Sequence, residues 1–152
     1  MPKQKVLRAV LLAAAAAAFS SCDENLSTLA GPTPNLAPTF ATIQSEIFEK
    51  TDSAGRPACT NCHTAVGRNP AGQLNLTHDA AYDQIVNAPV RGAGKAGSIR
   101  VVPGDPDNSY LIQKLEGTPG IVGQRMPFNG GPYLTSGQMV ILRRWIANGA
   151  SR

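Results

Sequence analysis

Cys59-Thr60-Asn61-Cys62-His63 is the stretch of this chain that decides how the rest of the sequence is interpreted. The spacing Cys-x-x-Cys-His is the attachment motif of a c-type haem. In such a site both thiols, here those of Cys59 and Cys62, form thioether bonds to the vinyl groups of the porphyrin. The adjacent histidine, His63, becomes the proximal ligand of the iron. The motif therefore predicts one covalently bound haem c.

Two other kinds of site use the same cysteine spacing. A structural zinc site needs four protein ligands, and this chain offers only Cys59, Cys62, His63 and His78. That set uses both histidines, and it requires the adjacent Cys62 and His63 to ligate together. A thioredoxin-like dithiol needs a βαβ context, which the surrounding sequence lacks. A zinc site and a simple disulfide remain the alternatives to haem.

The first 21 residues have the pattern of an export signal. A basic start precedes the apolar, alanine-rich stretch Val10–Phe19, which is too short for the roughly 20 residues of a membrane-spanning helix. Ser20 and Ser21 then precede Cys22, which resembles a bacterial lipoprotein signal whose cysteine is lipidated. Phe19 departs from the usual aliphatic residue, and an ordinary cleavable signal is the alternative. We predict a signal peptide over residues 1–21 and a lipid anchor at Cys22.

The number of cysteines agrees with this combination. An exported protein with three cysteines has one that cannot pair within the chain. Lipidation of Cys22 and haem attachment through Cys59 and Cys62 leave no cysteine without a role.

The charge of the chain excludes one class of partner. The full sequence carries 14 Lys and Arg against 10 Asp and Glu. Removing Lys3, Lys5 and Arg8 with the signal leaves 11 basic residues, so the mature chain has a net charge near +1. A nucleic-acid-binding domain carries a much stronger basic surface, and we expect no nucleic-acid partner.

The mature chain divides into a linker and one domain. Residues 22–38 contain the anchor cysteine, three prolines and small polar residues without apolar periodicity, which is typical of a linker. Residues 39–152 have the length of a single domain. Such a linker would tether a globular domain to a lipid anchor.

Two helices are expected in the first half of the domain. The first begins after Thr39, a candidate N-cap, and the second begins after Thr77 and ends before Pro89. The apolar residues at helical spacing are Phe40, Ile43, Ile47 and Phe48 in the first helix and Tyr82, Ile85 and Val86 in the second.

Two more helices are expected in the second half. The third has Asp105 as its N-cap followed by Pro106, and the fourth has a capping box in which Thr135 is the cap and Gln138 lies three residues on. The apolar residues are Tyr110, Leu111 and Leu115 in the third helix and Met139, Leu142, Trp145 and Ile146 in the fourth. In the fourth helix, Arg143 and Arg144 point away from the apolar face, and Gly149 is expected at its C-terminal end. No alternating strand pattern is present. We predict an all-α fold with about four short helices and long Gly/Pro-rich loops that pack on a haem.

A haem iron with one histidine ligand needs a second axial partner. The mature chain has two methionines, and Met139 lies on the apolar face of the last helix, where core packing is the usual role. Met126 lies in a loop before that helix, where it can present a thioether to the iron. We predict Met126 as the distal ligand, with His78 as the second choice.

Histidine–methionine ligation would determine what the iron can do. It raises the reduction potential relative to harder ligands, because a soft sulfur favours ferrous iron. A six-coordinate iron also has no open position for oxygen or peroxide. The predicted activity is outer-sphere electron transfer and not enzyme catalysis. A five-coordinate haem that binds a small ligand, or acts as a peroxidase or sensor module, is the alternative.

The motifs together resemble the class I-like cytochrome c domains of exported bacterial proteins over roughly residues 40–150. The resemblance rests on these elements in order: Ile47-Phe48, Cys59-x-x-Cys62-His63, Gly72 to Leu76, Val102 to Asp105, Ser109 to Leu111, Arg125-Met126-Pro127 and Trp145-Ile146-x-x-Gly149-Ala150. It implies a cytochrome c-like fold in which the first and last helices touch. It also implies a backbone carbonyl near Pro70 that binds the free nitrogen of His63.

The resemblance implies further roles. Arg125 and Tyr110 are candidates to contact the haem propionates, and the segment 49–58 is longer than usual for the family, either as a surface excursion or as a partner contact. The implied protein is a membrane-tethered electron shuttle, or a subunit of a redox complex, that faces the periplasm or the outer cell surface. Its partners would be the membrane, through the anchor, and other redox proteins.

Overall fold

The computed structural model describes residues 36–128 and 130–152, so the predicted signal peptide and Cys22 lie outside the described residues. Within these ranges the chain is helix-dominated and contains isolated β-bridges but no strand. No described helix is both long and apolar enough to cross a membrane. The elements are α3 (Phe40–Ile43), the π-helical turn η2 (Gln44–Phe48), the 3₁₀ turns η3 (Cys59–Asn61) and η4 (Ala71–Gln73), α4 (Ala81–Ile85), α5 (Tyr110–Glu116) and α6 (Ser136–Ala147). The predicted all-α class is confirmed at this level.

The first predicted helix is confirmed, and it has two parts. The Thr39 hydroxyl accepts a hydrogen bond from the Thr42 N–H at 3.2 Å and caps α3. The chain then continues without interruption into the wider turn η2. All four apolar residues predicted for this segment are buried: Phe40, Ile43, Ile47 and Phe48.

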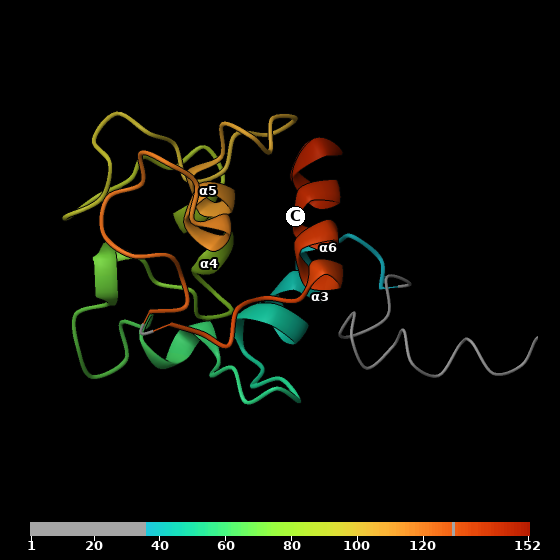
Figure 1. Ribbon diagram of the computed structural model, residues 1–152, viewed down its shortest axis with the longest axis horizontal. Coiled ribbons are helices and arrows are strands. Elements are labelled where there is room, and N and C mark those ends of the chain that lie inside the picture. Colours follow the sequence, from blue (N-terminus) through green and yellow to red (C-terminus); the bar gives the residue numbers. More distant parts are fainter. Residues whose placement is uncertain (1–35, 129) are drawn as a thin grey trace, which may run out of the picture.

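The last helix is also confirmed, including its capping box. The Thr135 hydroxyl accepts from the Gln138 N–H at 3.2 Å, and the Gln138 side-chain oxygen accepts from the Thr135 N–H at 3.0 Å. Gly149, which has a positive φ of 95°, follows the C-cap Asn148 as expected. Helix α6 runs along one side of the domain (Figure 1).

The third predicted helix begins later than its sequence suggests. Asp105 accepts from the Asn108 N–H at 3.1 Å and therefore caps a separate turn, whereas α5 starts at Tyr110. The buried Ser109 hydroxyl holds that turn, because it donates to the Asp105 carbonyl at 2.8 Å and accepts from the Val102 N–H at 2.9 Å. These bonds end the turn before the helix can begin, so the prediction of Asp105 as the N-cap was wrong.

The second predicted helix is shorter at both ends. The Thr77 carbonyl accepts from the N–H groups of Ala80 and Ala81 in a turn, and α4 starts only at Ala81. At the other end, Val86 is extended and pairs with Val101, so the backbone leaves the helix one residue earlier than the apolar pattern indicates. The pairing with a distant segment overrides the local helical pattern here.

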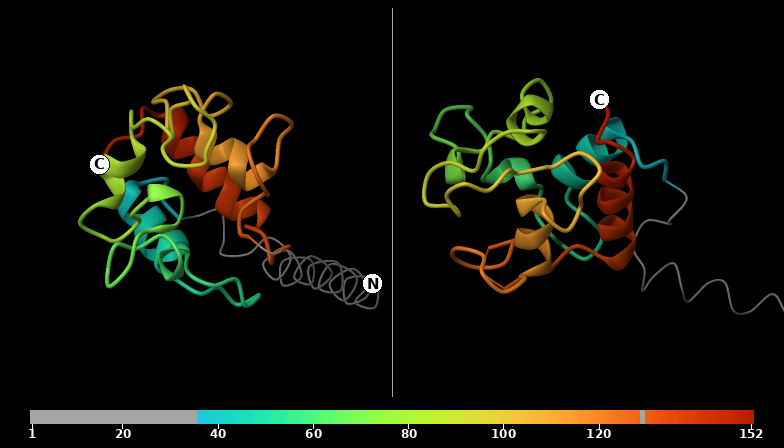
Figure 2. Two further views of the ribbon diagram at one scale, coloured as in Figure 1. Left: turned by 90° about the vertical axis from the view of Figure 1, so that its left-hand side faces the viewer. Right: turned by 90° about the horizontal axis from the view of Figure 1, so that it is seen from above.

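The expected contact between the first and last helices is present. The Phe40 and Trp145 rings lie 5.7 Å apart between their centroids, and the Tyr82 ring meets Phe40 edge-on at 5.1 Å. Ile43, Ile47, Leu142 and Trp145 belong to the same buried core. Figure 2 shows α3, in cyan, beside α6, in red. The long loops pack outside this helical core.

Candidate functional site

A cavity of about 300 Å³ lies between the helical core and the long loops. Its wall contains Cys59 and His63 from one tight turn and Met126 from a distant loop. The other wall residues are mostly apolar, including Ile47, Phe48, Leu74, Leu76, Ile85, Val90, Leu111, Leu115, Val122 and Phe128. Cofactor cavities have this character and occupy roughly 300–1,000 Å³. The fold thus brings the predicted proximal and distal ligands to one apolar cavity.

The two cysteines share one tight turn. Within and after η3, the Cys59 carbonyl accepts from the N–H groups of Cys62 at 3.2 Å and His63 at 2.9 Å. Cys59 lies in the cavity wall and is half-buried, whereas Cys62 is exposed and is not a wall residue. Both thiols are free, so the disulfide alternative is not what the structure contains.

The Cys59 thiol lies in a largely apolar environment. Burial raises its pKa, and the nearby Arg56 guanidinium opposes this effect only in part. The thiol donates to the Ile47 carbonyl oxygen at 3.5 Å. Cys59 is therefore a neutral thiol near pH 7 and is held against η2 on the cavity side.

The His63 imidazole is oriented by a backbone carbonyl. Its Nδ1 lies 2.8 Å from the carbonyl oxygen of Ala71, the residue after Pro70, which agrees with the expected position. A carbonyl can only accept, so Nδ1 carries the hydrogen and Nε2 keeps its lone pair. Burial lowers the pKa of His63, although the bond to Ala71 opposes it. A neutral imidazole with a free Nε2 is the form that binds a metal.

Helix α5 holds the loop that carries Met126. The Met126 N–H donates to the Lys114 carbonyl at 2.9 Å, and the preceding Arg125 donates from Nε to the Leu115 carbonyl at 2.7 Å. Lys114 Nζ also donates to the carbonyls of Val122, at 3.0 Å, and Gln124. Met126 is half-buried against the core, as is Met139, but only Met126 lies in the cavity wall.

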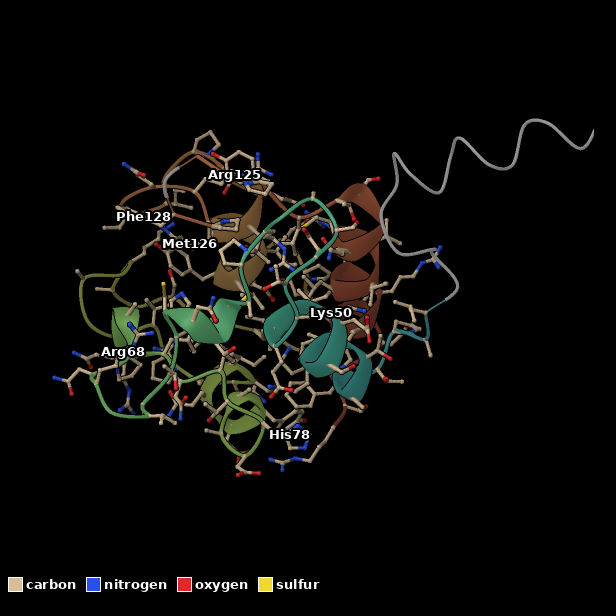
Figure 3. The ribbon with its side chains drawn as sticks, turned by 90° about the horizontal axis from the view of Figure 1, so that it is seen from below. Lys50, Arg68, His78, Arg125, Met126 and Phe128 are labelled. Carbon is tan, nitrogen blue, oxygen red and sulfur yellow. The ribbon has the colours of Figure 1, made fainter. Side chains whose placement is uncertain are left out.

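His78 is far from this arrangement. Its side chain is 77% exposed, and its Nδ1 lies 3.9 Å from a Glu49 carboxylate oxygen. It is not a wall residue, and Figure 3 shows it on a different part of the surface from Met126. Across residues 36–128 and 130–152, no three His, Cys, Asp or Glu side chains gather closely enough to hold a metal. The four-ligand zinc set, which requires His78, is therefore not assembled among the described residues.

The two candidate propionate contacts lie differently. Tyr110 is in the cavity wall, and its hydroxyl accepts from the Val122 N–H at 3.0 Å. Arg125 is not a wall residue, and its guanidinium carbon lies 3.8 Å from the Tyr133 ring centroid. The structure thus brings Tyr110 to the cavity and directs Arg125 towards an aromatic ring.

Three basic wall residues were missed from the sequence: Arg91, Arg100 and Lys114. Arg100 is only 6% exposed, and its guanidinium donates to the carbonyls of Gln84 at 2.8 Å and Gln73 at 3.0 Å. None of the ion pairs among the described residues includes it. Burial, and then the charge of Arg91, lowers the pKa of Arg100. A buried cation without a carboxylate favours an anionic ligand, and no sequence motif signals it.

Comparison with known proteins adds no relative: no family model, no curated protein and no solved structure matches this chain. The functional argument therefore depends on the residues and contacts described above.

Proposed function

We propose that this protein is a mono-haem c-type cytochrome with a cytochrome c-like fold, which carries single electrons by outer-sphere transfer. Cys59 and Cys62 would hold one haem c covalently, with His63 as the proximal and Met126 as the distal ligand. When bound, the haem c supplies a one-electron iron couple. The chain itself would supply the ligands, the apolar surroundings and the access route.

The meeting of His63 and Met126 at one apolar cavity is the observation that carries this proposal. The two residues are 63 positions apart in the sequence, and a tight turn and a loop bring them to the same cavity wall. A chain built to leave iron open to a small ligand has no need of a thioether in the wall. Ligation from both sides supports electron transfer over ligand binding or peroxidase activity.

The chain's own groups would prepare the site. The bond from His63 Nδ1 to Ala71 fixes the ring, so Nε2 is the nitrogen left for iron. The mostly apolar wall would surround the haem, and the thioether of Met126 would favour the ferrous state, which raises the reduction potential. Arg100 and Arg91 in the wall, with Tyr110, would face the anionic edge of the cofactor.

The proposed setting follows from the N-terminal sequence. Export followed by lipidation of Cys22 would tether the domain to a membrane at the periplasmic or outer cell surface. The protein would act there as an electron shuttle or as the electron-transfer subunit of a redox complex. Its partners would be other redox proteins, and we propose no enzymatic activity and no nucleic-acid partner for the chain itself.

A visible spectrum of the purified protein, expressed with haem-maturation machinery, tests the central proposal. We expect a pyridine haemochrome of c type and a far-red sulfur–iron band in the ferric protein. Met126→Ala should abolish that band, whereas Met139→Ala, the matched change in the other mature methionine, should retain it. A colourless protein, or a band that survives Met126→Ala, would overturn the proposal or the ligand assignment respectively.

The tether has a separate test. In cells, the full chain should partition with the membrane fraction, and Cys22→Ala should release a haem-containing protein or leave the precursor unprocessed. A Cys22→Ala protein that is processed and membrane-bound like the parent would exclude lipidation at this residue, without bearing on the haem assignment.

A further inference from the structure

The segment between the first helix and the haem motif contains a fully buried cation. The Arg56 side chain has no exposed surface, although it lies in the segment 49–58, for which a surface excursion or a partner contact was predicted. Its Nε donates to an Asp52 carboxylate oxygen at 3.1 Å, and its Nη1 donates to the Pro57 carbonyl at 3.2 Å. Nη1 also lies 3.7 Å from the sulfur of Cys59.

The backbone of this segment is organised around the same pair. The Asp52 carboxylate accepts from the N–H groups of Ala54 at 3.0 Å and Arg56 at 2.9 Å, and its side chain is only 9% exposed. The Asp52 N–H in turn donates to the Arg56 carbonyl at 3.1 Å. The segment therefore forms a compact turn. This turn places the Arg56 guanidinium next to the Cys59 sulfur.

Stability alone does not explain this arrangement. Removing a guanidinium and a carboxylate from water costs several kcal/mol per ion, and their attraction only repays that cost when the remaining polar atoms are satisfied. Here Nη2 of Arg56 is buried and has no hydrogen-bond partner. A solvated loop could connect η2 to η3 without such a pair, so the position of the charge calls for another explanation.

The two charges of the pair are placed unequally with respect to Cys59. The cation contacts the sulfur through Nη1, whereas the Asp52 carboxylate binds the guanidinium at Nε and has no contact with that sulfur among the bonds of the described residues. Because Arg56 and Asp52 are buried, solvent and salt screen the field of their charges far less than they screen charges at the surface. A group attached through Cys59 would therefore experience the cation more strongly than the anion.

We propose that the Arg56–Asp52 pair sets the reduction potential of the haem held by Cys59, with Arg56 favouring the ferrous state and Asp52 moderating its effect. This inference rests on the proposed function. Oxidation of the iron adds one positive charge to the cofactor. A nearby buried cation disfavours that charge and raises the potential, and a nearby anion lowers it.

Three variants of the haem-loaded protein test the pair. Arg56→Met removes the cation at similar length and should lower the midpoint potential, whereas Asp52→Asn removes the anion at the same shape and should raise it. Arg56→Lys keeps the charge and should lie between Arg56→Met and the parent. Lys50→Met is the matched control, because it removes an equal charge from the exposed Lys50–Glu46 pair nearby; its shift should be the smallest and should vanish in high salt.

The potentials are measured by redox titration followed in the visible spectrum, together with the unfolding temperature of each variant. Shifts of opposite sign for Arg56→Met and Asp52→Asn support the proposal, because general loosening of the site would move both in the same direction. Unchanged potentials, or shifts of equal sign, would overturn it even if both variants unfold earlier. If Arg56→Met does not fold, the sign of the Asp52→Asn shift decides.

The result also separates this inference from the proposed function. A parent protein without a c-type pyridine haemochrome would overturn the proposed function, and this inference with it. A parent protein with the haemochrome but with potentials insensitive to Arg56 and Asp52 would overturn this inference alone.

Discussion

Met126 and Lys114 are linked through the backbone: the N–H of Met126 donates to the carbonyl oxygen of Lys114 at 2.9 Å. The Lys114 side chain reinforces this link, since its ammonium group binds the carbonyls of Val122 and Gln124 in the same loop. Lys114 therefore binds the loop at three residues, Val122, Gln124 and Met126, the last of which is the predicted distal ligand. Under the proposed function, the strength of the sulfur–iron bond depends on that helix.

Lys114→Met should weaken the hold on the loop while keeping the length of the side chain. The variant loses two hydrogen bonds, each worth about 0.5–1.5 kcal/mol, so we expect a loss of about 1–3 kcal/mol in the free energy of unfolding. The far-red band of the ferric protein should diminish, and carbon monoxide should bind the ferrous protein more readily. Lys50→Met, which removes an equal charge elsewhere, should change neither spectrum. Equal behaviour of the two variants would refute the role of Lys114.

Gly117→Ala should displace Met126 through its neighbour Arg125. Gly117 ends α5 with a φ of 72°, and a Cβ there would lie 2.9 Å from Cδ of Arg125. Gly55→Ala is the matched control, because Gly55 has a φ of 80° but nothing within 4 Å of its Cβ position. Both changes should cost about 1 kcal/mol through backbone strain, but only Gly117→Ala should also reduce the far-red band. A reduced band in both variants would contradict this account.

Glu116→Gln should loosen the contact between α5 and α6. Arg143 binds both oxygens of Glu116, at 2.7 and 2.9 Å, and one oxygen of Asp107 at 2.8 Å. These hydrogen bonds raise the pKa of Arg143, with the bond to Glu116 as the largest cause. The groups are about one-third exposed, so solvent screening limits the loss to about 0.5–1 kcal/mol in denaturant unfolding. Asp107→Asn, at a carboxylate that is 82% exposed, should cost less; the reverse order would sink the prediction.

Under the proposed function, Arg100→Met should change the titration of an anionic group of the haem. A nearby cation lowers the pKa of a carboxylate, so removal of Arg100 should move the pH dependence of the midpoint potential towards higher pH. Arg125→Met is the informative comparison, because Arg125 was predicted for this role but lies outside the cavity wall. We expect the larger displacement for Arg100→Met in redox titrations across pH. A larger displacement for Arg125→Met would restore the earlier assignment.

Local patterns predicted the parts of the fold that local bonds stabilise. The Thr39 cap and the Thr135–Gln138 capping box each need only residues three positions apart, and both are present. The start of α5 was predicted wrongly because Ser109 forms its bonds to Val102, a neighbour that no periodicity reveals. The end of α4 was missed for the same reason, since Val86 pairs with Val101.

The candidate site divides in the same way. Cys59, Cys62 and His63 are predicted from their spacing, because the proposed thioether attachment and ligation would involve five consecutive residues. Met126 could be chosen from the sequence by elimination, since the mature chain has only one other methionine. The basic wall residues could not be predicted from the sequence. Arg91 and Arg100 flank a glycine-rich segment, and its sequence does not indicate whether the flanking side chains are solvated or buried.

The sequence by itself therefore determined the cofactor class to expect, the helical character and the residues able to ligate, since these depend on chemistry between near neighbours. The tertiary structure alone decided which of these residues share a cavity. It brought Met126 to the cavity wall and left His78 on the surface. Such contacts arise from the packing of segments distant in sequence, whose combined burial no single segment encodes.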